Sequence, residues 1–325
     1  MSKQRTRLTL VMPVFNDWQS AGLLLADIEA AMAAAPVTID VVLVDDGSTE
    51  PPPATYAAGP RIERVDCLRL AANVGHQRAI AIGLAEVVER AATGLIGVLD
   101  SDGEDRPVEL CRMVDLALKA PGRAYVAQRA QRSESLLFRL FYKVYVGLFR
   151  ILTGQKIRFG NFTVMPVELA KKIINDQNIW NNFPAAIVRS RLPVTYVPTK
   201  RGKRYIGQSR MNFVTLVAHG LGAISVFSDA VFIRILLFSA GLVAFSVLLG
   251  GAALYMKLFT TLALPNWATT VLGFSLVISL QALMMPILMA FMLLNARSTI
   301  QPLPKTVILQ MVAERIEVPL SRLQD

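Results

Sequence analysis

The strongest constraint on this chain of 325 residues is a pair of long uncharged stretches in its C-terminal third. Residues 235–256 and about 269–294 contain no Asp, Glu, Lys or Arg. At about 1.5 Å per residue, a helix over the first stretch is roughly 33 Å long, enough to cross a hydrocarbon core of about 30 Å. The short link carries Pro265 and Trp267, which suit a turn at a membrane interface. The two stretches therefore predict a transmembrane helical hairpin within residues 230–296.

The flanks of this hairpin indicate its orientation. Arg234, Arg297 and Lys305 lie near its outer ends, whereas Lys257 alone lies in the link. Because basic residues gather on the cytoplasmic side, both termini are expected in the cytoplasm. The alternative is a pair of buried helices in a large soluble core, which two adjacent uncharged stretches of this length disfavour. The first apolar run of the chain ends at Pro13, too early for a signal peptide, and is expected to be a strand.

Composition narrows the class of protein further. With 53% hydrophobic residues and a mean hydropathy of +0.44, the chain is too apolar for an ordinary soluble enzyme or a disordered protein. Cys67 and Cys111 are its only cysteines, which excludes a disulfide scaffold.

Residues 1–130 alternate short apolar runs with helical patterns. The apolar runs are Leu8–Val14, Ile39–Val44, Ile62–Leu70 and Leu95–Leu99, and the helical patterns cover Asp17–Ala34, Ala79–Ala92 and Pro107–Ala120. This alternation predicts an α/β fold with a mostly parallel sheet and helices on both faces. Polar clusters follow the four runs: Asn16-Asp17, Asp45-Asp46-Gly47-Ser48, Asn73 to Gln77, and Asp100-Ser101-Asp102. Because ligands of such sheets bind at the carboxyl ends of the strands, one crevice can gather all four clusters.

The fourth cluster has the character of a metal site. Asp100 and Asp102 stand one residue apart, and Glu104 follows two residues later. Carboxylates at this spacing suit Mg²⁺ or Mn²⁺ shared with a diphosphate. Acidic triplets also form solvated turns, and Asp105 before Pro107 also fits a helix cap.

Histidine chemistry has little support. His76 and His219 are the only histidines, too few for a zinc site or a convincing Ser-His-Asp triad. We expect His76 to be a hydrogen-bonding loop residue and His219 to be part of a helix at the membrane surface.

Two segments between the sheet and the hairpin fit interfacial helices. Residues 134–152 are mostly apolar and carry a narrow polar stripe at helical spacing. The stripe consists of Ser135, Arg139, Lys143, Gly147 and Arg150. A core helix with one solvated stripe is the alternative. Residues 211–229 form a second, weaker candidate that leads into the first spanning helix.

A net charge of +10 and the basic run Lys200–Arg204, followed by Arg210, admit three interpretations. Nucleic-acid binding is disfavoured because no nucleic-acid-binding module surrounds the run. Basic residues near a membrane attract anionic lipids, and arginines also hold phosphates through paired hydrogen bonds. We favour a mixture in which Arg204 and Arg210 act at the site and the remaining basic residues act electrostatically.

Four motifs in order resemble those of family 2 glycosyltransferases of the Rossmann-like GT-A fold. They are Val11-Met12-Pro13-Val14-Phe15-Asn16-Asp17, Val44-Asp45-Asp46-Gly47-Ser48-Thr49, Asn73-Val74-Gly75-His76-Gln77-Arg78-Ala79 and Leu99-Asp100-Ser101-Asp102. With the juxtamembrane helices, the hairpin and the segment Arg204–Arg210, nearly the whole chain resembles the polyprenyl-phosphate glycosyltransferases. These include dolichyl-phosphate mannose synthases and bacterial glucosyl and aminoarabinosyl homologues.

The resemblance implies roles for individual residues. Those expected to bind the nucleotide are Pro13, Phe15, Asp17, Asp45, Asp46, Asn73, Gln77 and Asp100, with Asp45 and Asp46 at the uracil or ribose. Asp100, Asp102 and Glu104 would hold Mg²⁺ or Mn²⁺; the family usually has Gln where Glu104 stands. Arg129, Arg204, Ser209 and Arg210 would hold the acceptor phosphate and the leaving diphosphate.

The chain departs from this pattern at Asn161, where some bacterial members have an Asp regarded as a catalytic base. Asn cannot accept the proton. A lipid phosphate is already anionic near neutral pH, however, so positioning and charge neutralisation are sufficient. We therefore expect activity without a base at position 161.

The resemblance implies inverting transfer of a sugar, UDP-linked, to undecaprenyl or another polyprenyl phosphate. It also implies a cytosolic catalytic domain over residues 1–210, a juxtamembrane helix over 211–229, and a cytosolic tail over 297–325. A bacterial inner membrane and a possible homo-oligomer are expected. The alternatives are a membrane glycosyltransferase with another lipid or glycan acceptor, for which Asp105 is the candidate base, and a non-catalytic membrane scaffold.

Overall fold

The structure is a computed structural model that describes residues 5–91, 93–129, 136–155, 159–207, 213–260, 266–298, 306 and 310–322. The chain divides into two compact units. The first comprises Met1–Arg139, Ile157–Val226 and Gln301–Asp325, and the second comprises Leu140–Lys156 and Phe227–Ile300. The first unit contains the sheet, and the second contains the long apolar helices.

An eight-stranded sheet forms the centre of the first unit, in the order β8-β6-β7-β5-β1-β2-β4-β9. The strands are β1 (Thr6–Val14), β2 (Val37–Asp45), β4 (Ile62–Leu70), β5 (Leu95–Val98), β6 (Ala124–Arg129), β7 (Thr163–Pro166), β8 (Val194–Thr199) and β9 (Val312–Glu317). Only β7 and β9 run antiparallel to their neighbours among these strands. The predicted mostly parallel α/β sheet is therefore confirmed. Two short strands, β3 (Tyr56–Ala58) and β10 (Leu320–Arg322), pair separately.

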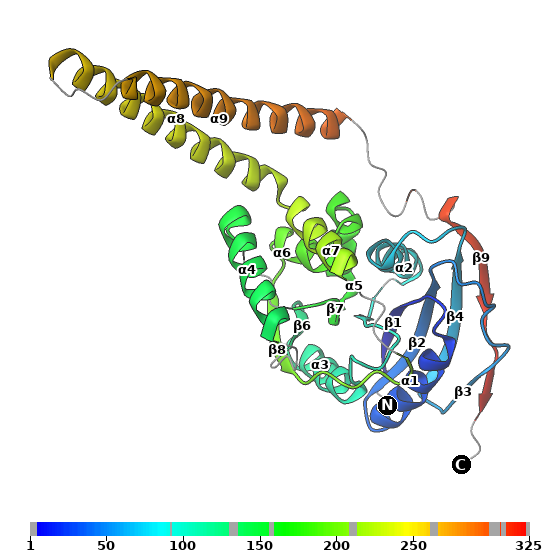
Figure 1. Cartoon of the computed structure of the whole chain (residues 1–325). Coiled ribbons are helices and arrows are strands. Elements are labelled where there is room, and N and C mark those ends of the chain that lie inside the picture. The colour runs from blue at the N-terminus through cyan, green and yellow to red at the C-terminus, as the bar shows by residue number, and fades with distance from the viewer. Residues whose placement is uncertain are drawn as a thin grey trace. The chain divides into compact units, whose positions relative to one another are not determined.

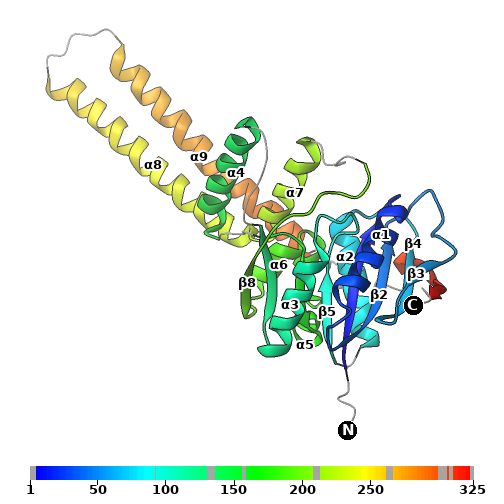
Figure 2. The same ribbon diagram turned by 90° about the horizontal axis from the view of Figure 1, so that it is seen from below.

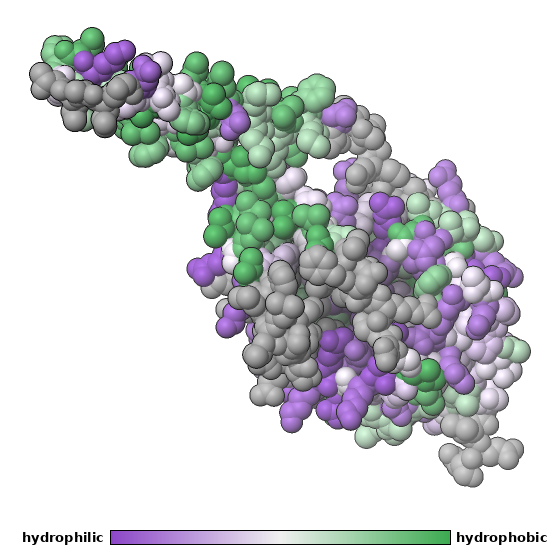
Figure 3. All heavy atoms as spheres, in the orientation of Figure 1, coloured by the Kyte–Doolittle hydropathy of each residue, from purple (hydrophilic) through white to green (hydrophobic). Residues whose placement is uncertain are grey.

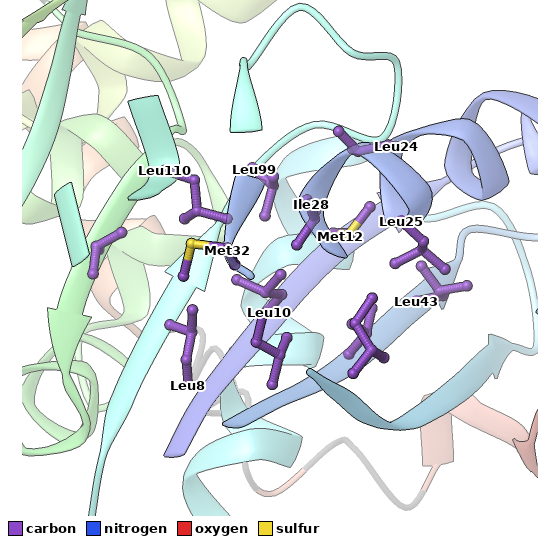
Figure 4. Close-up of a cluster of buried hydrophobic side chains, with 14 of the residues drawn as sticks. Leu8, Leu10, Met12, Leu24, Leu25, Ile28, Met32, Leu43, Leu99 and Leu110 are labelled. Atoms are coloured by element: carbon purple, nitrogen blue, oxygen red, sulfur yellow. The ribbon is translucent and has the colours of Figure 1, made fainter. Parts of the chain in front are cut away.

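Helices cover both faces of this sheet (Figures 1 and 2). One face packs against α1 (Trp18–Ala31) and α3 (Pro107–Lys119), and the other against α2 (His76–Arg90), α5 (Val167–Ile173), η1 (Gln177–Trp180) and α6 (Phe183–Arg189). Alternation along β1 sends Leu8, Leu10 and Met12 to the α1 face, where Figure 4 shows them with Ile28, and Val11 to the α2 face. Since both faces are covered, β1 is apolar at every position from Leu10 to Val14.

The order of the strands locates a crevice. The chain leaves β1 for β2 on one side and returns, after β4 and α2, to β5 on the other side of β1. Ligands of doubly wound sheets bind outside the carboxyl ends of the strands at such a reversal. The predicted gathering of the polar clusters at one edge therefore agrees with the observed topology.

The segment after the apolar helices contributes to the first unit. Strand β9 pairs with β4 at the edge of the sheet (Figure 1). Nε and Nη2 of Arg315 donate to the two carboxylate oxygens of Glu86 in α2, at 3.0 and 3.1 Å. No strand is predicted here from the sequence, which suggests only a tail. Residues near the C-terminus therefore complete the sheet that begins near the N-terminus.

Two antiparallel helices form most of the second unit: α8 (Ser228–Phe259) and α9 (Trp267–Ser298). The space-filling view shows mostly hydrophobic residues along this hairpin (Figure 3). In the described part of the chain, these are the two helices long and apolar enough to cross a membrane. Only 17% and 11% of their most apolar windows are buried, whereas the core helices of a soluble protein are mostly buried. The predicted hairpin is confirmed, and its surface suggests anchoring in a membrane.

The two segments expected at the membrane surface are helical: α4 (Leu136–Thr153) and α7 (Phe213–Ser225). On α4, Val144, Leu148 and Ile151 are exposed. In the second unit, Arg234 of α8 donates to the carbonyl oxygens of Arg150 and Ile151, at 3.2 and 2.5 Å. On α7, which belongs to the first unit, Val217 and Leu221 are exposed. The location of these helices at a membrane surface stays a prediction.

Candidate functional site

Arg204 joins the two strand ends at the crevice. Its Nη2 lies 2.8 Å from Oδ2 of Asp17, which follows β1, and its Nη1 lies 3.5 Å from Oδ2 of Asp102, which follows β5. Its Nε donates to the carbonyl oxygen of Ile206 at 3.2 Å, which fixes the guanidinium plane. One cation therefore bridges two carboxylates that belong to different motifs.

The segment that carries Arg204 packs over the loop after β5. The backbone N–H of Gly202 donates to the carbonyl of Glu104 at 2.8 Å, and that of Tyr205 donates to the carbonyl of Asp102 at 3.0 Å. Gly103, with φ of +86°, lies under the ring of Tyr205, and any Cβ there would overlap the ring. A glycine is therefore required at position 103, between Asp102 and Glu104.

The three predicted metal ligands have different partners. Oδ1 of Asp100 lies near His76 and Asn161, Asp102 faces Arg204, and Glu104 pairs with Arg201. Burial, and then the charge of Asp100, raise the pKa of Asp102 to about 6. Among the described residues, no three His, Cys, Asp or Glu side chains form a metal-binding group. Since Mg²⁺ is held by one or two carboxylates plus substrate phosphates, Asp100 and Asp102 fit a cation that arrives with a diphosphate. The roles of Asp100, Asp102 and Glu104 as metal ligands stay predictions.

His76 is the first residue of α2 and lies at the crevice. Its Nε2 is 3.1 Å from Oδ1 of Asp100 and 2.9 Å from Nδ2 of Asn161. Burial lowers the pKa of His76, but the carboxylates of Asp100, Asp46 and Asp102 together outweigh it, and the net shift is upward. The predicted hydrogen bonding of His76 agrees with these contacts, but its predicted location in a loop is wrong, because His76 begins α2. His219 of α7 lies 3.4 Å from the amide of Asn182, a residue that the sequence did not single out.

Asp46 braces the turn before α2. Its two carboxylate oxygens accept hydrogen bonds from the N–H groups of Val74 and Gly75, at 2.7 and 3.0 Å. Gly75 has a φ of +90°, a conformation that favours glycine. Burial raises the pKa of Asp46, against the lowering effect of these two donors. The motif therefore has a structural use in addition to any contact with a nucleotide.

Asp45 is buried at the end of β2 and is paired within the protein. Its Oδ1 accepts from the N–H of Ser48 at 2.7 Å, and its Oδ2 lies 3.3 Å from Nε of Arg69. Arg69 also bonds to Glu314 of β9 at 3.3 Å. Sequence reasoning missed Arg69; the available signal is a basic residue one position before the end of a parallel strand.

The remaining positions expected to bind a nucleotide differ in exposure. Pro13 lies inside β1 and is buried, whereas Phe15 and Asn73 are exposed near the strand ends. Asn16, beside Phe15, has a φ of +49° and accepts a hydrogen bond from the N–H of Thr49 at 2.9 Å. This bond ties the turn after β1 to the turn after β2.

Gln77 and Asn161 contact each other. Nε2 of Gln77 donates to Oδ1 of Asn161 at 3.0 Å, while Oε1 of Gln77 accepts from the N–H of Phe183 at 2.7 Å. Nδ2 of Asn161 lies 3.4 Å from Oδ1 of Asp100. Asn161, where the resemblance implied an acidic residue, is therefore held beside the predicted metal-binding loop.

Asp105 braces the loop after β5. It is buried, and its Oδ2 accepts from the N–H of Asp100 at 3.1 Å. The residue that caps α3 is Arg106, so the interpretation of Asp105 as a helix cap is wrong. The cause is the bend of the loop, which turns Asp105 inward toward the end of β5.

Three predicted residues cannot be placed in the site. Arg129 ends β6, but its side chain lies outside the described part of the structure. Ser209 and Arg210 lie outside the described residues altogether. Their expected contacts with phosphate groups stay predictions.

Comparison with known proteins agrees with the motifs. The model of glycosyl transferase family 2 matches residues 9–172, half of the chain. The chain is 30% identical over 138 residues to dodecaprenyl-phosphate galacturonate synthase of Rhizobium johnstonii, covering 42% of this chain and 40% of that protein. It is 29% identical over 153 residues to undecaprenyl-phosphate 4-deoxy-4-formamido-L-arabinose transferase of Pectobacterium carotovorum, covering 46% and 45%. The matches thus span less than half the length of these two relatives.

Among solved structures, the chain is similar to glucosyl-3-phosphoglycerate synthase of Mycobacterium tuberculosis. The identity is 13%, the TM-score is 0.46, and the similarity covers 69% of this chain and 80% of that one. That protein was solved with Mn²⁺, UDP and glucosyl-3-phosphoglycerate.

Proposed function

Because the chain belongs to glycosyl transferase family 2, we propose that it transfers a sugar from a nucleotide donor, UDP-linked, to polyprenyl phosphate. The product is a polyprenyl-phospho-sugar with inverted anomeric configuration. The names of the two relatives support this acceptor, since each name pairs a polyprenyl phosphate with a sugar, and the two sugars differ. The apolar hairpin supports it as well, because a lipid-linked acceptor must be met at a membrane.

The observation that carries the proposal is the position of Arg204 between Asp17 and Asp102. A nucleoside diphosphate at the reversal of strand order would bring its phosphates to the carboxyl ends of β1 and β5. A guanidinium there can bind phosphate oxygens in pairs and stabilise the charge that develops as the diphosphate leaves. The neighbouring carboxylates keep Arg204 charged and oriented before the donor binds.

Asp100 and Asp102, with Glu104 as a further candidate, would hold Mg²⁺ or Mn²⁺ together with the donor diphosphate. A divalent cation would supply charge neutralisation for the leaving group. The protein itself supplies orientation: the loop that carries the two aspartates is fixed by Arg204, by Tyr205 and by the side chain of Asp105.

In the transfer step, an oxygen of the lipid phosphate attacks the anomeric carbon of the sugar. The bond from that carbon to the nucleoside diphosphate breaks on the opposite side, and the diphosphate takes the electron pair. No proton has to leave the nucleophile, so Asn161 suffices where a base is absent. Arg129, Ser209 and Arg210 are proposed to hold the acceptor phosphate.

We further propose that residues 1–210 form a cytosolic catalytic domain at the inner leaflet of a bacterial inner membrane. Helices α4 and α7 would lie in the headgroup layer, since both expose apolar side chains. The hairpin α8–α9 would anchor the protein, with both termini cytoplasmic.

A membrane glycosyltransferase with a hydroxyl acceptor is the main alternative, and it would need a base. Asp105 is the candidate for that base, but its buried carboxylate is bonded to the N–H of Asp100. This contact favours the phosphate acceptor. A scaffold without activity is the other alternative, and the bridged carboxylates at the crevice disfavour it.

The decisive experiment incubates detergent-purified protein with Mn²⁺, radiolabelled nucleotide sugars and undecaprenyl phosphate, and counts label in the organic phase. We expect label from one donor, and none from that donor with Asp102→Ala. If no donor labels the lipid while UDP still binds, the acceptor assignment is wrong. If UDP does not bind either, the scaffold alternative is favoured.

A further inference from the structure

Three hydrogen bonds run in one direction from the start of α6 to the loop after β5. The N–H of Phe183 donates to Oε1 of Gln77 at 2.7 Å, and Nε2 of Gln77 donates to Oδ1 of Asn161 at 3.0 Å. Nδ2 of Asn161 then donates to Oδ1 of Asp100 at 3.4 Å. We refer to these three bonds as the amide chain.

The chemistry at its two ends fixes the direction of the amide chain. A backbone N–H such as that of Phe183 can only donate, so the oxygen of Gln77 must face it. The amino group of Gln77 then faces Asn161, and the oxygen of Asn161 must turn toward it. The amino group of Asn161 is left on the side of Asp100, whose ionised carboxylate can only accept.

Both ends of the Gln77 side chain are thus engaged by protein atoms, although its motif suggested contact with the nucleotide. We propose that Gln77 is a positioning residue, which holds the carboxamide of Asn161 in the orientation that presents an N–H group to Asp100. This inference rests on the proposed function, because it assigns Gln77 a part in the same transfer. Gln77 acts through Asn161 and does not itself touch the donor.

The orientation matters because of the charge on Asp100. In the observed orientation, the amino group of Asn161 donates to Oδ1 of Asp100, the same oxygen that faces His76. With the amide of Asn161 reversed, an oxygen would face that carboxylate, and the repulsion would displace Asp100. A displacement of the carboxylate shifts whatever the loop after β5 binds.

The informative variant is Gln77→Glu. A glutamate has nearly the same volume and keeps an oxygen for the N–H of Phe183, but it has no N–H for Asn161. Asn161 would then turn its own amino group toward Glu at position 77 and its oxygen toward Asp100. We expect kcat/KM for sugar transfer to fall about tenfold or more, the loss that corresponds to one hydrogen bond to a charged group.

A double-mutant cycle tests whether Gln77 acts through Asn161. Gln77→Glu is measured in the natural protein and again in the Asn161→Ala variant, which has no amide to orient. We expect a loss of about tenfold in the first case and less than about twofold in the second. The same loss in both backgrounds would overturn the inference, because Gln77 would then act on the donor directly. No loss in the natural protein would overturn it as well.

Thermal unfolding supplies a second readout that needs no substrate. We expect Gln77→Glu to lower the Tm in the natural protein and to leave it nearly unchanged in the Asn161→Ala variant, since the broken contact is absent there. Equal shifts in the two backgrounds would show that the residues are not bonded, and would overturn the inference. If even the natural protein transfers no sugar to polyprenyl phosphate, the proposed function fails, and this thermal cycle still decides the positioning role.

Discussion

Nη2 of Arg204 lies 2.8 Å from Oδ2 of Asp17, although 187 positions separate them in the chain. The same guanidinium faces Asp102. These contacts tie the segment after β8 to the ends of β1 and β5, which gives Arg204 a structural use beside the chemical one proposed above. The two uses can be separated by variants that keep the charge or remove it.

Arg204→Lys keeps the charge but cannot reach both carboxylates with a planar fork. We expect kcat/KM to fall about 10- to 100-fold for Arg204→Lys and further for Arg204→Ala. The measurement is organic-phase label from the donor identified for the natural protein. Lys203→Ala is the matched control, since Lys203 lies in the same segment and is exposed. A loss as large in the control would mean that general positive charge, and not the Arg204 bridge, supports transfer.

Asp102→Asn should abolish transfer and stabilise the metal-free protein. The pKa of Asp102 is raised to about 6 in the folded chain, by burial and then by Asp100, from an ordinary value of 3.8. The folded state is therefore penalised once Asp102 ionises: the penalty is absent below pH 3.8, grows between pH 3.8 and about 6, and is complete above that. In EDTA, the Tm of Asp102→Asn should exceed that of the natural protein by about 3 °C or more at pH 7 and by nothing at pH 3.5. An advantage that is equal at both pH values would contradict this explanation.

Mn²⁺ should reverse that order. A cation that binds only the folded protein raises its Tm by mass action. If Asp100 and Asp102 hold the cation, millimolar Mn²⁺ with UDP should raise the Tm of the natural protein by several degrees and that of Asp102→Asn much less. Equal increases would place the cation elsewhere.

The ion pair of Glu86 with Arg315 should make the folded protein less stable at acidic pH. Burial alone would raise the pKa of Glu86, but the hydrogen bonds and charges of Arg315 and Arg90 outweigh it and lower that pKa below 4.5. The ionised Glu86 therefore stabilises the folded protein above pH 4.5, and this stabilisation is lost as the pH falls below that value. Glu86→Gln should lower the Tm at pH 7, with a difference that shrinks below pH 4.5. Glu317→Gln, which removes the exposed partner of Arg64, should change the Tm little at any pH.

The hairpin offers adjacent glycines for a packing test. A Cβ on Gly250 would lie 3.5 and 3.6 Å from Leu272 and Ser275 of α9, whereas a Cβ on Gly251 meets nothing within 4 Å. Gly250→Leu should therefore force the helices apart and cost about 1–3 kcal/mol, while Gly251→Leu should be nearly neutral. Thermal unfolding in detergent, followed by the circular dichroism of the helices, compares the two. Equal destabilisation would mean that α8 uses a different face against α9.

Much of this architecture could be predicted from the sequence, because local patterns carry it. The first strands follow from short apolar runs, the first helices follow from the helical patterns between these runs, and the hairpin follows from length and lack of charge. The polar clusters fall at strand ends, so their meeting at one edge follows from parallel pairing. None of these inferences needs knowledge of distant contacts.

The parts that could not be predicted depend on contacts between distant residues. Strand β9 contains Glu314, Arg315 and Glu317, and such a charged segment has a weak strand pattern until its partner β4 is known. The turn of Asp105 toward Asp100 depends on the bend of one loop. The orientation of Gln77 is set by a backbone N–H 106 residues away. No pattern in the sequence near Gln77 predicts that the N–H of Phe183 lies beside it.

The place of β9 in the sheet sets the order in which the protein can be made. A ribosome releases the sequence from the N-terminus onward, so the strands from β1 to β8 emerge before α8 and α9, and β9 and β10 emerge after them. The edge of β4 is therefore open while the hairpin is being synthesised. Because β9 can close that edge only after α8 and α9 have been synthesised, one edge of the sheet stays unpaired until the proposed membrane anchor has been made.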